Sequence, residues 1–121
     1  MVNKTTYGNT KNILIAQDSY HVALPVVVSG TANAVIEAGS PLTGDITKRD
    51  TAFTASTTDA VGILLHDVTL DSAGKGNGTL VLAGCVDLLK LSSTVQGNIT
   101  TALADDGQKL DNIIFVKGSA I

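Results

Sequence analysis

Two apolar runs on either side of a glycine-rich stretch constrain this chain more than any other feature. The first run covers residues 60–68 and the second residues 79–88. Between them, residues 70–78 hold three glycines together with aspartate, serine and asparagine. Apolar runs that flank such a segment are typical of paired antiparallel strands. We therefore expect a β-hairpin whose tip, residues 71–78, is a long mobile loop.

The N-terminal part of the chain has a different texture. Residues 1–12 are polar and predict a flexible arm, whereas residues 13–28 are apolar and poorly closed by turn signals. Large apolar residues recur at every second position over residues 22–28, which predicts a strand. Pro25 restricts this strand to an edge or a bulge, because proline has no N–H to donate to the hydrogen-bond ladder of a sheet. We expect residues 1–30 to form an extended arm that lies against a partner, and residues 31–121 to form the folded domain.

The remaining segments complete a β-rich fold. Residues 48–59 are polar and threonine-rich, and predict a loop anchored by Phe53. Ser92 and Ser93 are helix-capping residues ahead of a helix over 94–104, and residues 110–116 predict a last strand. The expected apolar face of the helix is Val95, Ile99, Ala102 and Leu103. The predicted fold class is mainly β with one short helix, as a compact small β-barrel or β-sandwich-like domain.

Composition excludes several classes of protein. The 121 residues suffice for one domain, and a single cysteine excludes an intrachain disulfide framework or a cysteine-cluster metal site. Aromatic residues make up 3% and the formal net charge is −3, which argues against binding nucleic acid. No segment has the roughly 20 consecutive apolar residues that a membrane span needs, and the N-terminus lacks the apolar core of a signal peptide. We expect synthesis and folding in a cytoplasm, with no membrane partner.

Catalytic and metal-binding interpretations are weak. Cys85, His66 and Asp67 are the available nucleophile, base and orienting residue, but Cys85 lies in an apolar strand where a free thiol usually packs as a small hydrophobe. Asp67, Asp71 and Asp87 could offer oxygens to a hard cation, yet their spacing matches no calcium loop. The glycines at 74, 76 and 78 precede a strand, whereas a dinucleotide site needs a helix there. We expect no catalytic, cofactor or metal site.

Three segments in fixed order carry a family resemblance. Residues 34–42 (AVIEAGSPL), 60–68 (AVGILLHDV) and 78–87 (GTLVLAGCVD) resemble tailed-phage capsid decoration proteins. The similarity is to the capsid-binding domain of head fibre proteins and to lambda-type head decoration proteins. It covers about residues 33–90, and the strand near Ile113–Phe115 is compatible with it.

The resemblance implies a structural protein of the virion that binds the outer capsid surface and bridges neighbouring major capsid proteins. It also implies a homotrimer at three-fold positions, with an N-terminal arm that adds a strand to the capsid protein. The expected capsid-binding residues of this arm are Ile13, Leu14, Ile15, Val22, Leu24 and Val26. The alternative is a carbohydrate- or host-surface-binding β module, which the scarcity of aromatic side chains disfavours.

Overall fold

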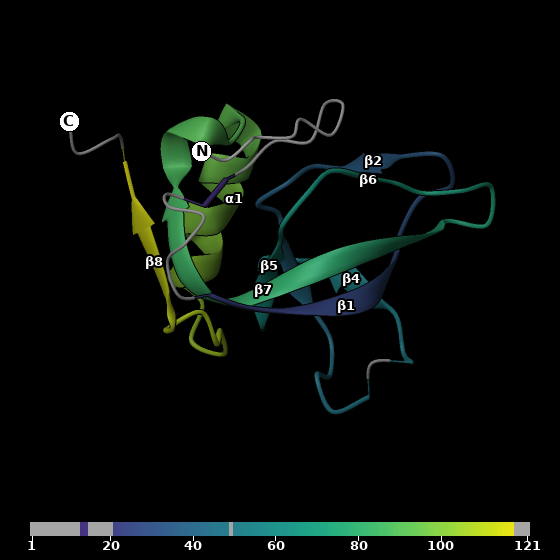
Figure 1. Ribbon diagram of the computed structural model, residues 1–121, viewed down its shortest axis with the longest axis horizontal. Coiled ribbons are helices and arrows are strands. Elements are labelled where there is room, and N and C mark those ends of the chain that lie inside the picture. The colour runs from purple at the N-terminus through teal and green to yellow at the C-terminus, as the bar shows by residue number, and fades with distance from the viewer. Residues whose placement is uncertain (1–12, 15–20, 49, 118–121) are drawn as a thin grey trace, which may run out of the picture.

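The computed structural model describes residues 13–14, 21–48 and 50–117. Figure 1 shows a small barrel with long strands in its wall, one helix packed beside it and a last strand at the outer edge. In chain order the elements are β1 (Val22–Ser29), β2 (Val35–Ile36), β3 (Pro41–Thr43), β4 (Phe53–Ala55), β5 (Gly62–Leu64), β6 (Val68–Thr69), β7 (Lys75–Asp87), η1 (Leu88–Lys90), α1 (Ser93–Leu103) and β8 (Ile113–Val116).

Five of the strands form a closed barrel. Their order is β1-β4-β3-β5-β7, and β1 pairs again with β7 to close the ring. The β1–β7 pairing is antiparallel and runs the length of β1, from Val22 to Ser29, whereas β1 meets β4 only at Val28 and Ser29. The strand pair expected from the two apolar runs is the antiparallel β5–β7 pair. The prediction of a compact β-rich domain with one short helix is confirmed, and its architecture is the barrel.

Two hydrophobic clusters hold the fold together. Every barrel strand contributes to the first cluster, which therefore fills the barrel interior; its buried members are Val26, Val28, Leu42, Phe53, Leu64, Val68, Leu70 and Leu80. Neighbouring residues on β5 and β7, Ile63 and Val81, belong to the second cluster, together with three residues of α1. Since successive strand residues face opposite sides, the second cluster lies between the outer barrel wall and the helix.

The helix follows its predicted pattern closely. Ser92 is the N-cap, and its hydroxyl accepts a hydrogen bond from the Val95 N–H at 3.2 Å. Val95, Ile99 and Ala102 are buried, as predicted. Leu103 is 42% exposed, so its predicted place on the buried face is wrong. It is the last residue of α1, where the chain turns away through the cap at Ala104.

The prediction of an apolar arm is wrong for its described residues. Residues 22–29 are β1, a wall of the barrel instead of an extension beyond it. Ile13 and Leu14 are buried in the second cluster, and Leu14 forms a β-bridge with Val86. The boundary expected at residue 30 therefore does not separate an arm from the domain in this part of the chain. Residues 1–12 and 15–20 lie outside the described residues.

The prediction of a mobile glycine-rich loop is also wrong. The turn after β6 is short, and β7 begins at Lys75. Gly76 and Gly78 lie within β7 and pair with Val28 and Val26 of β1. A Cβ atom at Gly78 would lie 2.8 Å from the Leu64 side chain, and one at Gly76 would lie 2.7 Å from that of Val68. These glycines leave room for neighbouring side chains in the barrel.

The threonine-rich segment holds a short strand that the sequence did not predict. Residues 53–55 form β4, which pairs with β3 and with the end of β1. Phe53 is fully buried in the barrel interior and is the anchor that we expected. Its ring also occupies the space beside Gly44, where an added Cβ atom would overlap it.

Candidate functional site

The structure does not bring the three candidate catalytic residues together. Cys85 is in the part of β7 that pairs with β8, opposite Ile114. His66 follows Leu65, whose N–H donates to the Thr79 carbonyl, six residues earlier on β7. At about 3.3 Å per residue, roughly 20 Å of strand separates the two positions. This set of residues therefore forms no common site.

His66 has one unusual property of its own. Its Nδ1 atom is buried, and no hydrogen-bond partner for it lies within the part of the chain that the structure describes. The adjacent Asp67 does not bond to this atom, and its Oδ1 accepts the Ala38 N–H at 2.7 Å. His66 is therefore a partly buried side chain without the partner that a catalytic base needs for orientation.

The three candidate metal ligands each accept hydrogen bonds from backbone N–H groups: Asp67 across a long-range contact, Asp71 and Asp87 within local turns. Asp67 binds the backbone of residue 38, and Asp71 Oδ1 accepts hydrogen bonds from the Ala73 and Lys75 N–H groups. These bonds, that from Lys75 first, hold the pKa of Asp71 below its usual value of 3.8. Asp87 accepts the Leu89 N–H as the N-cap of η1. Within the described ranges no three metal-ligating side chains gather.

Most of the expected capsid-binding residues are not available at the surface. Ile13 is fully buried, Leu14 and Val26 are each 5% exposed, and Val22 and Leu24 are partly buried. Ile15 lies outside the described residues. Binding a partner through Ile13 or Val26 would require opening a core cluster, so neither side chain is accessible to a partner in this structure.

The outer edge of β8 is the other candidate for a docking surface. β8 stands outside the closed ring and pairs with β7 in parallel, on one side only among the described strands. The Gly84 N–H donates to the Asn112 carbonyl. This bond fixes which residues at β8 direct their N–H and C=O groups toward β7: residues 112, 114 and 116. The N–H and C=O of Phe115 consequently point away from β7. Ile114, on the outer face of the strand, is 62% exposed.

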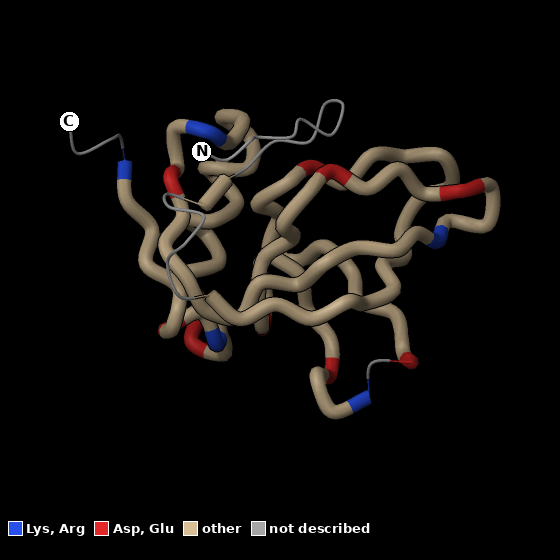
Figure 2. Tube along the Cα trace, viewed as in Figure 1, with Lys and Arg blue, Asp and Glu red and all other residues tan. Residues whose placement is uncertain are grey.

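Most of the helices and strands, β8 included, contain no charged residue, although Lys117 directly follows β8. Figure 2 shows the acidic and basic residues gathered on turns and loops. The strand β8, the helix α1 and the strand β4 contain no charged residue. Contacts made by these elements must therefore be apolar or uncharged polar.

A charged cavity opens at one mouth of the barrel. Its volume is about 490 Å³, and Val61 and Leu82 form its apolar floor at the end of the barrel interior. Asp45 on its rim accepts hydrogen bonds from the Thr47 hydroxyl and N–H, which hold its pKa below the usual 3.8. The rest of the lining comprises Thr43, Gly44, Ile46, Asp59, Lys109 and Asn112. Charges of both signs at the rim do not select a ligand class.

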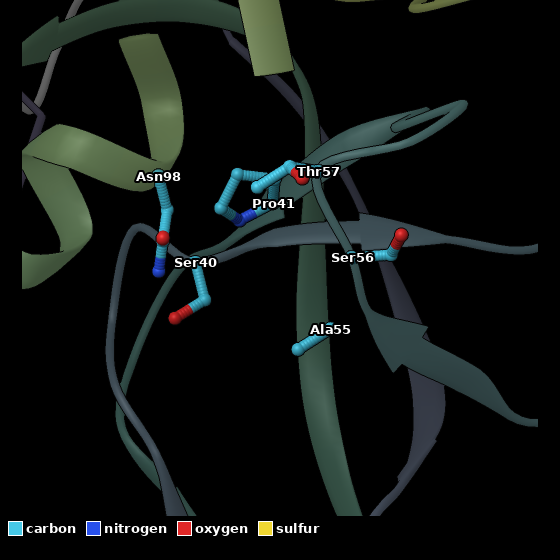
Figure 3. A pocket seen from close by; sticks show the side chains of 6 residues that line it. All are labelled: Ser40, Pro41, Ala55, Ser56, Thr57 and Asn98. Atoms are coloured by element: carbon cyan, nitrogen blue, oxygen red, sulfur yellow. The ribbon is translucent and has the colours of Figure 1, made fainter. Parts of the chain in front are cut away.

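A second cavity, of about 240 Å³, lies between the barrel and α1. Figure 3 shows the Asn98 amide reaching from the helix toward Ser40 and Pro41, with Ala55, Ser56 and Thr57 along the other side. Sequence reasoning missed this site because its residues come from three distant segments. The run of hydroxyl residues at 54–58 was the one visible signal.

Comparison with known proteins gives no family for the chain. No protein-family model matches it, and no curated protein sequence is significantly similar to it. Among the described residues, no helix is long and apolar enough to cross a membrane. What bears on function is therefore the geometry of the fold and the resemblance of the three segments.

Proposed function

We propose that this protein is a structural decoration protein that binds the outer surface of an assembled phage capsid and bridges major capsid proteins. The observation that carries the proposal is the outer edge of β8, which pairs with no other described strand, beside the exposed Ile114. An edge strand binds an extended segment of another chain through backbone hydrogen bonds, and neighbouring pockets add specificity. Such binding needs no catalytic group, which agrees with the dispersed positions of Cys85 and His66.

The arrangement of the three resembling segments supports this proposal. Residues of the first segment pair with residues of the second, at Pro41 and Ile63. The second segment pairs in turn with the third, at Ile63 and Val81. The segments that resemble decoration proteins are therefore neighbouring strands of one wall, which is the arrangement expected if the resemblance reflects a shared domain.

The proposed contact differs from the one that the sequence predicts. The sequence predicts an arm that binds through residues such as Ile13 and Val26, whereas we propose binding through β8. A strand of the capsid protein would pair with the Phe115 backbone, and Ile114 would pack against that strand. A homotrimer would place three such edges on one unit. Three weak contacts on a rigid unit raise the overall affinity without further chemistry.

Co-sedimentation tests the proposal. The purified protein is mixed with expanded capsids of the phage that encodes it and, separately, with unexpanded procapsids. We expect Ile114→Glu to weaken capsid binding by about tenfold or more, because a carboxylate would be buried without a partner. The matched control is Val35→Glu, since Val35 is 54% exposed and lies on β2, away from β8.

The outcomes separate the parts of the proposal. No co-sedimentation of the wild-type protein with any form of the capsid would refute the function itself. Equal binding by Ile114→Glu and the wild type would refute the role of β8. Light scattering across a concentration series measures whether the free protein is a trimer, and a capsid reconstruction with isolated single copies would contradict the trimer.

A further inference from the structure

We infer that the cavity between β3, β4 and α1 is a binding site for one pyranose ring of an uncharged glycan. This inference does not depend on the capsid proposal, because the cavity residues lie on elements that do not pair with β8. It concerns a second contact, made with a sugar-bearing surface. Three features of the cavity support it: free hydrogen-bonding groups, an uncharged lining and a small volume.

Ser40 is the most constrained polar residue of this cavity. It is 8% exposed, and its backbone is fixed because its N–H donates to Glu37 and its carbonyl accepts from Leu64. No hydrogen bond joins its hydroxyl to any residue of the described ranges. This hydroxyl is therefore available to a ligand or a water molecule in the cavity.

Two further polar groups line the cavity, on the partly buried Thr57 and the exposed Asn98. The Asn98 amide and the Thr57 hydroxyl have no hydrogen-bond partner among the described residues. The hydroxyls of Thr100 and Thr101 on α1 differ, since they donate to the carbonyls one turn earlier. The three available groups of the cavity come from three separate segments of the chain.

The kinds of group present select an uncharged polyhydroxyl ligand. A hydroxyl can both donate and accept, and an amide offers donors and an acceptor, which matches the hydroxyls of a sugar. Neither α1 nor residues 53–58 carry a charge that would bind a phosphate, a carboxylate or a cation. Pro41 and Ala55 add a small apolar surface for the C–H groups of a ring.

The size of the cavity limits the ligand to one ring. Its volume of about 240 Å³ is below the range of about 300–1,000 Å³ typical of sites for drug-sized molecules. No aromatic side chain lines it, so the ring gains no stacking energy. We therefore expect weak affinity for a single sugar, with a dissociation constant on the order of 1 mM.

The test uses nuclear magnetic resonance of the full chain. Methyl glycosides of glucose, mannose and N-acetylglucosamine are titrated separately to about 50 mM, well above the expected dissociation constant. Glycerol is titrated as an acyclic polyol. We expect saturable shifts of the backbone amides of Ser40, Thr57 and Asn98 with at least one glycoside, and no saturation with glycerol.

Three variants make the test specific. Asn98→Ala is expected to weaken binding by about fivefold, because each hydrogen bond contributes on the order of 1 kcal/mol. Ser40→Ala is expected to have a similar effect. The control is Thr100→Ala, two residues along the same helix and about 200° around its axis, which should change affinity by less than about twofold.

Each outcome bears directly on the inference. Saturation by a glycoside with selective loss in Asn98→Ala and Ser40→Ala supports it. No saturable shift with any glycoside would overturn it, as would equal responses to glycerol and glycosides. Shifts confined to the cavity at the barrel mouth, or equal losses in Asn98→Ala and Thr100→Ala, would also overturn it.

Discussion

The apolar segment at 22–29 and the glycine-rich segment at 70–78 contrast sharply in composition, yet both contribute to the wall that β1 and β7 form. The apolar segment has too little polar surface to face water alone, and the glycine-rich segment has too few side chains to form a core by itself. In the structure, Val26 and Val28 of β1 pair with Gly78 and Gly76 of β7. The apolar segment supplies side chains to the barrel interior, and the glycine-rich segment supplies the space for its neighbours. The composition of one segment therefore does not show its place in the fold unless its pairing with the other segment is known.

The largest expected effect tests whether Ile13, which the sequence assigns to the arm, belongs to the domain. Ile13→Ala should lower the free energy of unfolding by about 2–5 kcal/mol, because it leaves a cavity in a fully buried site. Urea denaturation measures this loss. Ile114→Ala, at an exposed position, should cost less than about 0.5 kcal/mol. Equal effects of the two substitutions would mean that residue 13 is not part of the core.

The next prediction opposes strand propensity to available space in the glycine-rich segment. Valine favours strands over glycine, but at Gly78 its side chain would press on Leu64 and Val68. We expect Gly78→Val to destabilise the protein by about 1–3 kcal/mol in thermal or urea unfolding.

The neighbouring position provides the control for this substitution. Asn77 is exposed and faces the other side of β7, so Asn77→Val should be neutral or stabilising by about 0.5 kcal/mol. If Gly78→Val stabilised the protein as much as Asn77→Val, residues 75–78 would be the mobile loop that the sequence predicts.

The smallest expected effect concerns the turn that leads into the glycine-rich strand. The pKa of Asp71 is held below 3.8 in the folded protein by backbone N–H groups, chiefly that of Lys75. Its stabilising contribution is therefore complete above pH 3.8 and is lost as the pH falls through the lower folded-state value. Urea titrations at a series of pH values, from neutral to below 3.8, give the free energy of unfolding of wild type and of Asp71→Asn. The difference between the two free energies should become smaller as the pH falls. A difference independent of pH would contradict this.

Local signals predicted much of the fold. The serine cap and the spacing of Val95, Ile99 and Ala102 fixed the helix, and the apolar runs located β5 and most of β7. These features depend on residues close in the sequence. The role of Gly76 and Gly78 could not be predicted in the same way, because it depends on Leu64, Val68 and β1, which the fold brings to them from elsewhere.

The candidate sites were less accessible to sequence reasoning. The expected docking residues were chosen for apolar character, and the same character placed Ile13 and Val26 in the core. Ile114 lies in an equally apolar run but faces outward, because successive strand residues face opposite sides and Ile113 faces the core. The polar cavity combines Ser40, Thr57 and Asn98, and no spacing in the sequence links these residues.

The closure of the barrel by β1 and β7 has a consequence for synthesis on the ribosome. Lys75 lies 46 positions after its partner Ser29 in the sequence, and the rest of the pairing spans longer intervals. At about 5–20 residues per second, β1 waits roughly 2–10 s before its partner emerges. During that time it is an apolar strand with unpaired edges, which is a hazard for aggregation. Pro25 lies in the middle of this strand, where its missing N–H interrupts pairing with other nascent chains while β7 still accepts it as a partner.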